Sequence, residues 1–194
     1  MYIQVYDDLF PDYLKDFYEL TILGRSGDMG LHPSIPFKCK YEDTAVDAQG
    51  RAPMSFFHVL KSSAANSEHF DNFFEIPRSY CKTHNLALQE ILAARIYLVL
   101  PYETAQAHGR PHTDFPFPHL VLLYYVNDAD GNTVFVDKEH RVVREVEPRK
   151  GRLLVFDGSL LHGGGIPRSG PRCVVNFNIL CQPKARPATA RAGP

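Results

Sequence analysis

The stretch HLVLLYYVNDADGNTVFVD, residues 119–137, places two apolar runs on either side of a polar turn. The runs LVLLYY and TVFV are rich in branched and aromatic residues, which are enriched in β-strands. The intervening DADGN contains Asp-Gly, a pair that readily adopts the backbone conformation of a tight turn. The stretch therefore predicts two buried strands, which the turn would join as a β-hairpin.

The same pattern of apolar runs and turns continues on both sides of this stretch, from residue 95 to residue 180. Short apolar runs alternate with turn residues such as Arg149-Lys150-Gly151. Six strands at this spacing are typical of a β-sandwich or barrel. The runs are RIYLVLPYE (95–103), HLVLLYYVND (119–128), NTVFVD (132–137), HRVVREVEP (140–148), GRLLVFDGS (151–159) and RCVVNFNIL (172–180).

The N-terminal half reads differently. MYIQVYDDLF opens with a short strand, and residues 11–23 show apolar positions at helical spacing after Pro11, which suits a first helical turn. Two further helices are expected around residues 56–75 and 83–95. Residues 24–55, rich in Gly, Pro, Ser and Asp, are expected to form a loop or lid. The apolar faces of these helices would pack on one outer face of the barrel.

The chain is expected to form one domain over residues 1–183. Residues 1–94 would supply the opening strand and supporting helices, and residues 95–183 the β core. The remaining KARPATARAGP, residues 184–194, has the composition of a disordered tail.

Composition narrows the class of partners. The 194 residues carry a formal net charge of -1, so no basic surplus favours nucleic acid or an anionic membrane. The longest apolar run, residues 120–126, is too short to span a bilayer, and the N-terminus lacks the pattern of a signal peptide. We therefore expect a cytoplasmic protein. The four cysteines form no CxxC pair, which disfavours a structural zinc site.

Four residues are candidates for binding a metal ion and a carboxylate. His112 and Asp114 stand two positions apart in RPHTDFPFPH (110–119), so in extended chain both side chains would share one face. His162 follows a predicted strand and turn, and Arg172 opens the last strand. Two imidazoles and one carboxylate suit an iron(II) site that leaves adjacent coordination positions open. A nearby arginine on a strand can hold a carboxylate through two hydrogen bonds.

These residues and their surroundings resemble the iron(II)- and 2-oxoglutarate-dependent oxygenases, in particular the prolyl-4-hydroxylase-like branch. The matching motifs are HTD, LLYYVNDADGNTVFVD, PRKGRLLVFDGSLLHGG and PRCVVNFNI, which together cover roughly residues 95–179. The opening VYDDLFPDYL also looks like the start of this branch. The resemblance implies a mainly β fold with flanking α-helices, a double-stranded β-helix of the jelly-roll or cupin-like type. It implies metal ligation by His112, Asp114 and His162.

The resemblance also implies a site for the cosubstrate. Arg172 would bind the distal carboxylate of 2-oxoglutarate, and Tyr125 matches a tyrosine that shares this carboxylate in related hydroxylases. Strand parity places Arg172, Val174, Asn176 and Asn178 on one face of the last strand and Cys173, Val175, Phe177 and Ile179 on the other. The second face is apolar and should pack outward. Asn176 and Asn178 would then point into the barrel and support the ligands or contact substrate.

The implied activity is a dioxygenase that uses Fe(II), 2-oxoglutarate and O₂, hydroxylates an unactivated C–H bond, and releases succinate and CO₂. Asp114 disfavours halogenation, while desaturation and cyclisation remain open. The substrate would be a small molecule, an amino acid or a peptide, and no oligomeric state is implied. Two alternatives remain: a cupin-type metal enzyme that does not use 2-oxoglutarate, and a non-catalytic metal- or ligand-binding barrel.

Other residues could rival these assignments. His108 lies near His112 but has no carboxylate two positions on, and Arg168 rivals Arg172 but sits in a Pro/Gly/Ser loop. His119 is expected in the core or at the rim. Arg95 is expected at the surface.

Overall fold

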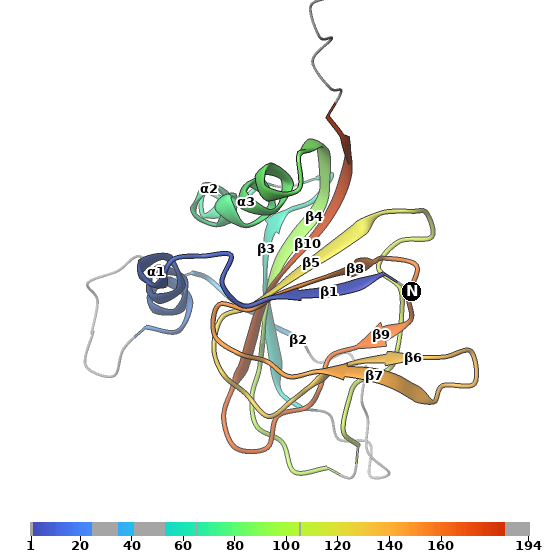
Figure 1. Ribbon diagram of the computed structural model, residues 1–194. Coiled ribbons are helices and arrows are strands. Elements are labelled where there is room, and N and C mark those ends of the chain that lie inside the picture. The colour runs from blue at the N-terminus through green and yellow to red at the C-terminus, as the bar shows by residue number, and fades with distance from the viewer. Residues whose placement is uncertain (1, 25–34, 41–52, 65, 105, 185–194) are drawn as a thin grey trace, which may run out of the picture.

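A computed structural model describes residues 2–24, 35–40, 53–64, 66–104 and 106–184, and its two β-sheets face each other (Figure 1). All strand pairs are antiparallel. The strands are β1 (Ile3–Tyr6), β2 (Lys38–Lys40), β3 (Ser55–Lys61), β4 (Leu86–Val99), β5 (Leu120–Tyr125), β6 (Thr133–Val136), β7 (Val142–Val146), β8 (Leu153–Asp157), β9 (His162–Gly163) and β10 (Arg172–Pro183).

The larger sheet has the order β1-β8-β5-β10-β4-β3-β2, and the smaller sheet has the order β7-β6-β9. Strands that are distant in sequence therefore alternate within the larger sheet, as in a double-stranded β-helix. The long strand β10 lies at its centre, between β4 and β5. This architecture confirms the mainly β fold with flanking helices.

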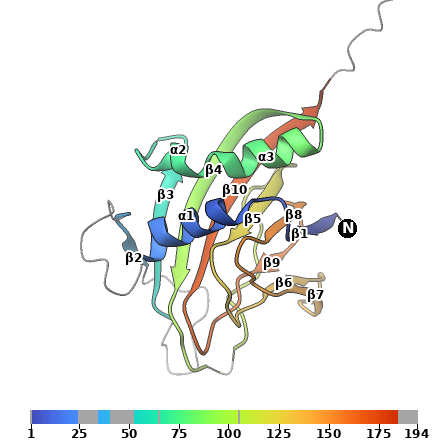
Figure 2. The ribbon, with the colours of Figure 1, turned by 60° about the vertical axis from the view of Figure 1, so that its left-hand side comes forward.

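The outer face of the larger sheet is covered by three helices, α1 (Asp12–Leu23), α2 (Phe70–Phe73) and α3 (Glu75–Thr83) (Figure 2). Tyr18 of α1 lies between two partners, with ring centroids 5.3 Å from Phe73 and 5.2 Å from Tyr124 of β5. The same core cluster contains the outward residues of β10: Cys173, Val175, Phe177 and Ile179. The expectation that these four residues pack against a second layer is confirmed.

A second cluster fills the space between the two sheets. Phe135 of the smaller sheet meets Phe156 of the larger one edge to face, with ring centroids 4.9 Å apart. Val174 of β10 and Tyr125 of β5 belong to this cluster. The inner face of β10 therefore looks into the barrel, as strand parity predicts.

The prediction of a hairpin at DADGN, residues 128–132, is wrong. This segment leaves β5 and enters β6, which belongs to the other sheet. Both edges of β5 are occupied, by β8 and by β10, so β6 cannot pair with it. The hairpin lies one connection later, where residues 137–141 join β6 to β7 and His140 adopts a left-handed φ of 61°.

Two of the expected helices are also misplaced. Residues 55–61 form strand β3, and the helices of this region are the short α2 and α3. Residues 86–99, expected to begin as a helix, form strand β4. Because β4 buries residues of both parities, including Ile91, Ala93 and Ala94, its apolar pattern lacks the alternation that marks a half-exposed strand.

The opening strand and the first helix lie where the sequence predicts them. Of the expected loop 24–55, residues 25–34 and 41–52 lie outside the described residues, and β2 falls between them. The expected tail also lies outside the described residues, apart from Lys184. None of the helices in the described segments is long and apolar enough to cross a membrane.

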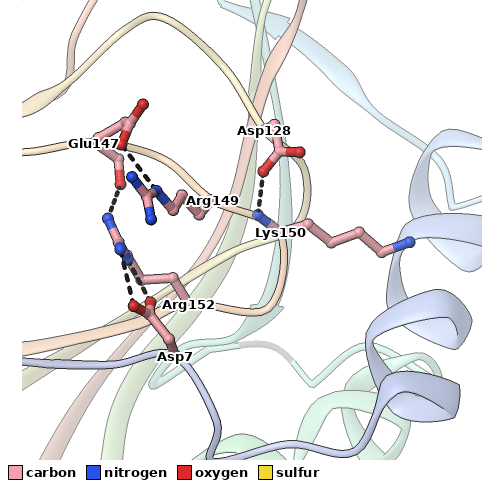
Figure 3. A network of polar contacts seen from close by, with 6 residues as sticks. All are labelled: Asp7, Asp128, Glu147, Arg149, Lys150 and Arg152. Carbon is pink, nitrogen blue, oxygen red and sulfur yellow. Dashed lines mark hydrogen bonds and ion pairs between the residues drawn. The ribbon is translucent and has the colours of Figure 1, made fainter.

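Polar contacts attach the N-terminal segment to the β7–β8 connection (Figure 3). Arg152 donates from Nε and Nη2 to the two carboxylate oxygens of Asp7, at 2.6 and 3.0 Å. The backbone N–H of Lys150 donates to Asp128 at 2.8 Å, and its Nζ reaches Asp16 of α1 at 2.6 Å. These contacts hold α1 against the turn that precedes β8.

Candidate metal centre and cosubstrate site

The three predicted metal ligands meet at one end of the barrel. His112 and Asp114 lie in the connection between β4 and β5, and His162 begins β9. The backbones of the two histidines pair through reciprocal hydrogen bonds of 2.9 and 3.0 Å. One ligand atom from each of the three residues lies within 4.8 Å of the others. The sequence prediction of this cluster is supported by its geometry.

Backbone carbonyls orient both imidazoles. Nδ1 of His162 lies 3.0 Å from the carbonyl of Leu160, and Nδ1 of His112 lies 3.2 Å from that of Arg110. A proton on Nδ1 would be donated to the carbonyl, which leaves the Nε2 lone pair for a metal. Nε2 of His112 lies 3.5 Å from Oδ1 of Asp114, so the two candidate ligand atoms face each other.

The charge states suit a divalent cation. Burial raises the pKa of Asp114, but hydrogen bonds from His112 and Asn176 and the charge of His162 outweigh burial, so this pKa lies well below its usual range. Burial lowers the pKa of His162, and the charge of Asp114 only partly opposes this effect. The site therefore offers an ionised carboxylate and a neutral buried imidazole at neutral pH.

Arg172 lies deeper in the barrel, at the start of β10, and is only 4% exposed. Its Nε donates to the carbonyl of Gly131 and its Nη2 to Oγ1 of Thr133, both at 2.9 Å. The hydroxyl of Tyr125 donates to the same Thr133 oxygen at 2.6 Å, and its ring centroid lies 5.7 Å from the guanidinium carbon. The structure thus brings Arg172 and Tyr125 together.

Arg172 carries a buried positive charge for which the described residues provide no ion-pair partner. Its contacts are a carbonyl, a hydroxyl and an aromatic ring. A buried charge without a counter-ion is costly, and burial lowers the pKa of Arg172 accordingly. Bound dicarboxylate would supply the missing negative charge in the bidentate geometry that guanidinium favours.

Two residues that position Arg172, Asn127 and Thr133, are not evident from sequence. Asn127, just after β5, accepts from the N–H of Cys173 at 3.0 Å and donates to the carbonyl of Pro171 at 2.7 Å. Oγ1 of Thr133 accepts hydrogen bonds from both Arg172 and Tyr125. An asparagine after a strand is an ordinary turn residue, and a threonine opening a strand is equally common. No local signal marks either one.

Asn176 and Asn178 behave differently. Nδ2 of Asn176 donates to Oδ2 of Asp114 at 3.1 Å, as expected for a residue that supports a ligand. Asn178 is buried two positions further on, and among the described residues its Oδ1 finds no hydrogen-bond partner. The structure brings Asn176, but not Asn178, into contact with the candidate ligands.

The rival residues lie apart from the cluster. Nδ1 of His108 contacts the carbonyl of Gly109, and His119 is buried with its Nδ1 on the carbonyl of Phe117. Neither joins the three-residue cluster found within the described segments. Arg168 is exposed. Arg95, expected at the surface, is instead half-buried, opposite Asn176 on the inner face of β4.

The fold and site together define a class of protein: a barrel with a two-histidine, one-carboxylate cluster and a buried arginine suited to a dicarboxylate. A family model described as the 2OG-Fe(II) oxygenase superfamily matches residues 56–180, more than half of the chain. The chain belongs to this superfamily and is an enzyme of this kind. The superfamily uses Fe(II), 2-oxoglutarate and O₂, and the cluster of His112, Asp114 and His162 could bind the metal.

Solved structures with the same fold include several prolyl hydroxylases. A viral collagen prolyl hydroxylase from Paramecium bursaria Chlorella virus-1 is 16% identical, with a TM-score of 0.55 over 92% of this chain and 96% of that one. A Pseudomonas putida prolyl-4-hydroxylase is 14% identical, with a TM-score of 0.59 over 91% of each chain. A prolyl hydroxylase from Trichoplax adhaerens, in complex with a hypoxia inducible factor peptide fragment, is 10% identical, with a TM-score of 0.59 over 91% of this chain and 83% of that one.

At these identities the likeness shows the fold alone. No curated protein matches the sequence.

Proposed function

We propose that this enzyme hydroxylates an unactivated C–H bond of a small molecule, an amino acid or a peptide, and converts 2-oxoglutarate and O₂ to succinate and CO₂. The observation that supports the proposal is the buried Arg172, which has no ion-pair partner among the described residues and lies in the same barrel as the three candidate ligands. An enzyme of the cupin type that does not use 2-oxoglutarate would have no need of this charge. A binding protein without catalytic activity would not need the open coordination positions.

We also propose that the enzyme acts in the cytoplasm.

Within this proposal, His112, Asp114 and His162 would hold the iron, and Arg172 with Tyr125 would hold the distal carboxylate of 2-oxoglutarate. The bound iron and cosubstrate supply the oxidising chemistry. Thr133 fixes the guanidinium, and Asn176 fixes the Asp114 carboxylate. The imidazole side chain of His112 is 51% exposed, whereas Asp114 is 10% exposed, so O₂ and substrate would enter on the His112 side.

Asp114 also bears on the reaction outcome. With iron bound, the carboxylate of Asp114 would take the coordination position that a halide needs, which favours hydroxylation over halogenation. Mass spectrometry of the product distinguishes the remaining outcomes. Hydroxylation under ¹⁸O₂ adds one labelled oxygen atom, whereas desaturation or cyclisation removes two hydrogen atoms. Products that only lose hydrogen would contradict the proposed hydroxylation.

The cosubstrate assignment is tested by anaerobic calorimetry of 2-oxoglutarate binding to the Fe(II)-loaded enzyme. Arg172→Gln should weaken binding by at least about 30-fold, which corresponds to roughly 2 kcal/mol for a lost buried charge pair. Arg168→Gln is the matched control, because Arg168 is exposed four positions away, and its affinity should equal that of the wild type. Equal affinities for wild type and Arg172→Gln would overturn the assignment.

A further inference from the structure

A second arginine faces the barrel interior. Arg95 of β4 pairs with Asn176 of β10 on one side and with Val59 of β3 on the other. Cross-strand partners point to the same face of a sheet, and Asn176 contacts Asp114 on the inner face. Arg95 is therefore placed beside the candidate metal centre, on the side of β3 and β4.

Arg95 is a half-buried cation without a carboxylate partner among the described residues. No carboxylate in the described segments forms an ion pair with it. Its described contact is Tyr97, two residues along the same face. Burial raises the pKa of Tyr97, the charge of Arg95 and a hydrogen bond from it act in the opposite direction, and the charge of Asp114 raises the pKa again. Tyr97 and Arg95 share the inner face of β4, opposite Val174 and Asn176 of β10. A guanidinium has five N–H donors, so one hydrogen bond to Tyr97 leaves donors for an anion.

An unpartnered acceptor stands directly beside Arg95. The amide nitrogen of Asn176 is engaged with Asp114, but its Oδ1 is buried and has no hydrogen-bond partner among the described residues. Asn176 itself is only 8% exposed. A buried acceptor without a donor is unfavourable, so a ligand that brings an N–H or O–H group there would gain a full hydrogen bond.

Arg95 and Arg172 mark different ends of the inner face. Arg172 pairs with Val99 of β4, and Asn176, the partner of Arg95, lies four residues further along β10. Four residues of extended chain span about 13 Å. A dicarboxylate held by Arg172 therefore leaves Arg95 available for a different molecule, and the candidate metal ligand Asp114 lies at the Arg95 end.

We propose that Arg95 binds the carboxylate of the substrate, and that the substrate is a free α-amino acid whose amino group donates to Oδ1 of Asn176. Neighbouring strands are about 4.8 Å apart, so a cation and an acceptor on paired residues can address two groups attached to one carbon. Val59 and Phe57, on the same face of β3 and partly buried, provide apolar surface for the side chain. The inference rests on the proposed function.

Calorimetry of the full-length enzyme loaded with Fe(II) and 2-oxoglutarate, without O₂, tests this proposal. Each standard L-amino acid is titrated, followed by the carboxamide of every one that binds. At least one amino acid should bind, and its amide should bind at least about tenfold more weakly, because the bidentate charge pair is lost. If no amino acid binds, or if the amide binds equally well, the proposal is overturned.

Variants locate the effect. Arg95→Met should weaken binding of that amino acid at least about tenfold, and Arg95→Lys should recover part of the loss because it restores the charge. Arg144→Met is the control, since Arg144 is exposed on β7, and it should bind like the wild type. Unchanged binding in Arg95→Met would overturn the proposal.

The 2-oxoglutarate titration separates this inference from the proposed function. If 2-oxoglutarate binds in an Arg172-dependent manner but amino acids do not, the proposed function stands and the inference fails. If 2-oxoglutarate does not bind to the iron-loaded wild type, the proposed function itself fails. If Arg95→Met also weakens 2-oxoglutarate binding, the wild-type enzyme decides: equal affinities for an amino acid and its carboxamide would overturn the inference, and weaker binding of the carboxamide would support it.

Discussion

The two faces of β10 carry opposite kinds of side chain. On the outer face, Cys173, Val175, Phe177 and Ile179 are buried in the core beneath the helices. On the inner face, Arg172, Asn176 and Asn178 place a charge and two amides in an equally buried environment. The outer residues are satisfied by packing, whereas Arg172 has no counter-ion, and Asn176 and Asn178 each keep an unpartnered oxygen among the described residues. Because side chains alternate along β10, its outer face contributes to stability and its inner face to the candidate site.

The largest effect should come from the ligand that the inner face supports. Asp114→Ala removes the only carboxylate of the cluster, so we expect Fe(II) affinity to fall by more than about 100-fold and turnover to be lost. The free energy of unfolding should fall by about 1–3 kcal/mol, because the buried amide of Asn176 loses its hydrogen-bond acceptor. Anaerobic iron titration and chemical denaturation measure the two quantities.

Asp8→Ala is the control for this variant, because Asp8 is exposed on the connection after β1. It should match the wild type in both measurements. An Asp114→Ala protein that binds iron normally would show that the inner face does not serve the metal.

The opposite pattern is expected for the outer face. Phe177 is fully buried against Phe70 and the helical layer, with the two ring centroids 6.5 Å apart. Phe177→Ala should lower the free energy of unfolding by about 3–5 kcal/mol through lost burial and a cavity. Iron affinity measured on the folded fraction should stay within about twofold. A selective loss of iron binding with unchanged stability would contradict the division between the two faces.

A smaller effect is expected at the far end of the inner face. Tyr125→Phe removes a hydroxyl that donates to Thr133 beside the guanidinium. In the proposed complex this hydroxyl would donate its proton to the bound carboxylate instead, so the variant loses one hydrogen bond to a charged group. The binding free energy of 2-oxoglutarate should become less favourable by about 1.5–3 kcal/mol. Calorimetry on the iron-loaded enzyme provides the value, with Tyr13→Phe, exposed on α1, as control. Unaltered affinity would remove Tyr125 from the cosubstrate site.

The smallest effect concerns the polar contacts at the sheet edge. The hydrogen bonds from Arg152 lower the pKa of Asp7 in the folded protein, so ionised Asp7 stabilises the fold above its unfolded pKa of about 3.9. Asp7 is about half exposed, which limits the contribution to about 1 kcal/mol or less. Asp7→Asn should therefore be less stable than wild type at pH 7. The difference should vanish as the pH falls through the folded pKa, and a difference that grows in acid would contradict this account.

The sequence was most informative where function depends on residue type and parity. The i, i+2 spacing of His112 and Asp114 and the alternation along β10 follow from local geometry. The pairing of β5, by contrast, depends on which strands occupy its edges, so the turn DADGN could not reveal that β6 belongs to the other sheet. Thr133 and Asn127 contribute through contacts with β10 that no local pattern encodes.

The misassigned segment at β4 has a related cause. Strand β4 has apolar residues at positions of both parities and polar Gln89, Glu90 and Arg95 among them, so its sequence lacks the alternation of a half-exposed strand and resembles a helix. Arg95 lies within this segment, and the sequence alone does not show which face of the strand it occupies. Its position became apparent only when the register opposite Asn176 was known.

The most direct test of the central claim is an anaerobic titration of the metal-free enzyme with Fe(II) and then 2-oxoglutarate, followed by visible absorption. We predict a weak charge-transfer band that requires both components, is retained in Arg168→Gln, and is lost in Arg172→Gln at the same concentrations. Iron binding without any band on addition of 2-oxoglutarate, or a band that Arg172→Gln leaves unchanged, would contradict the account.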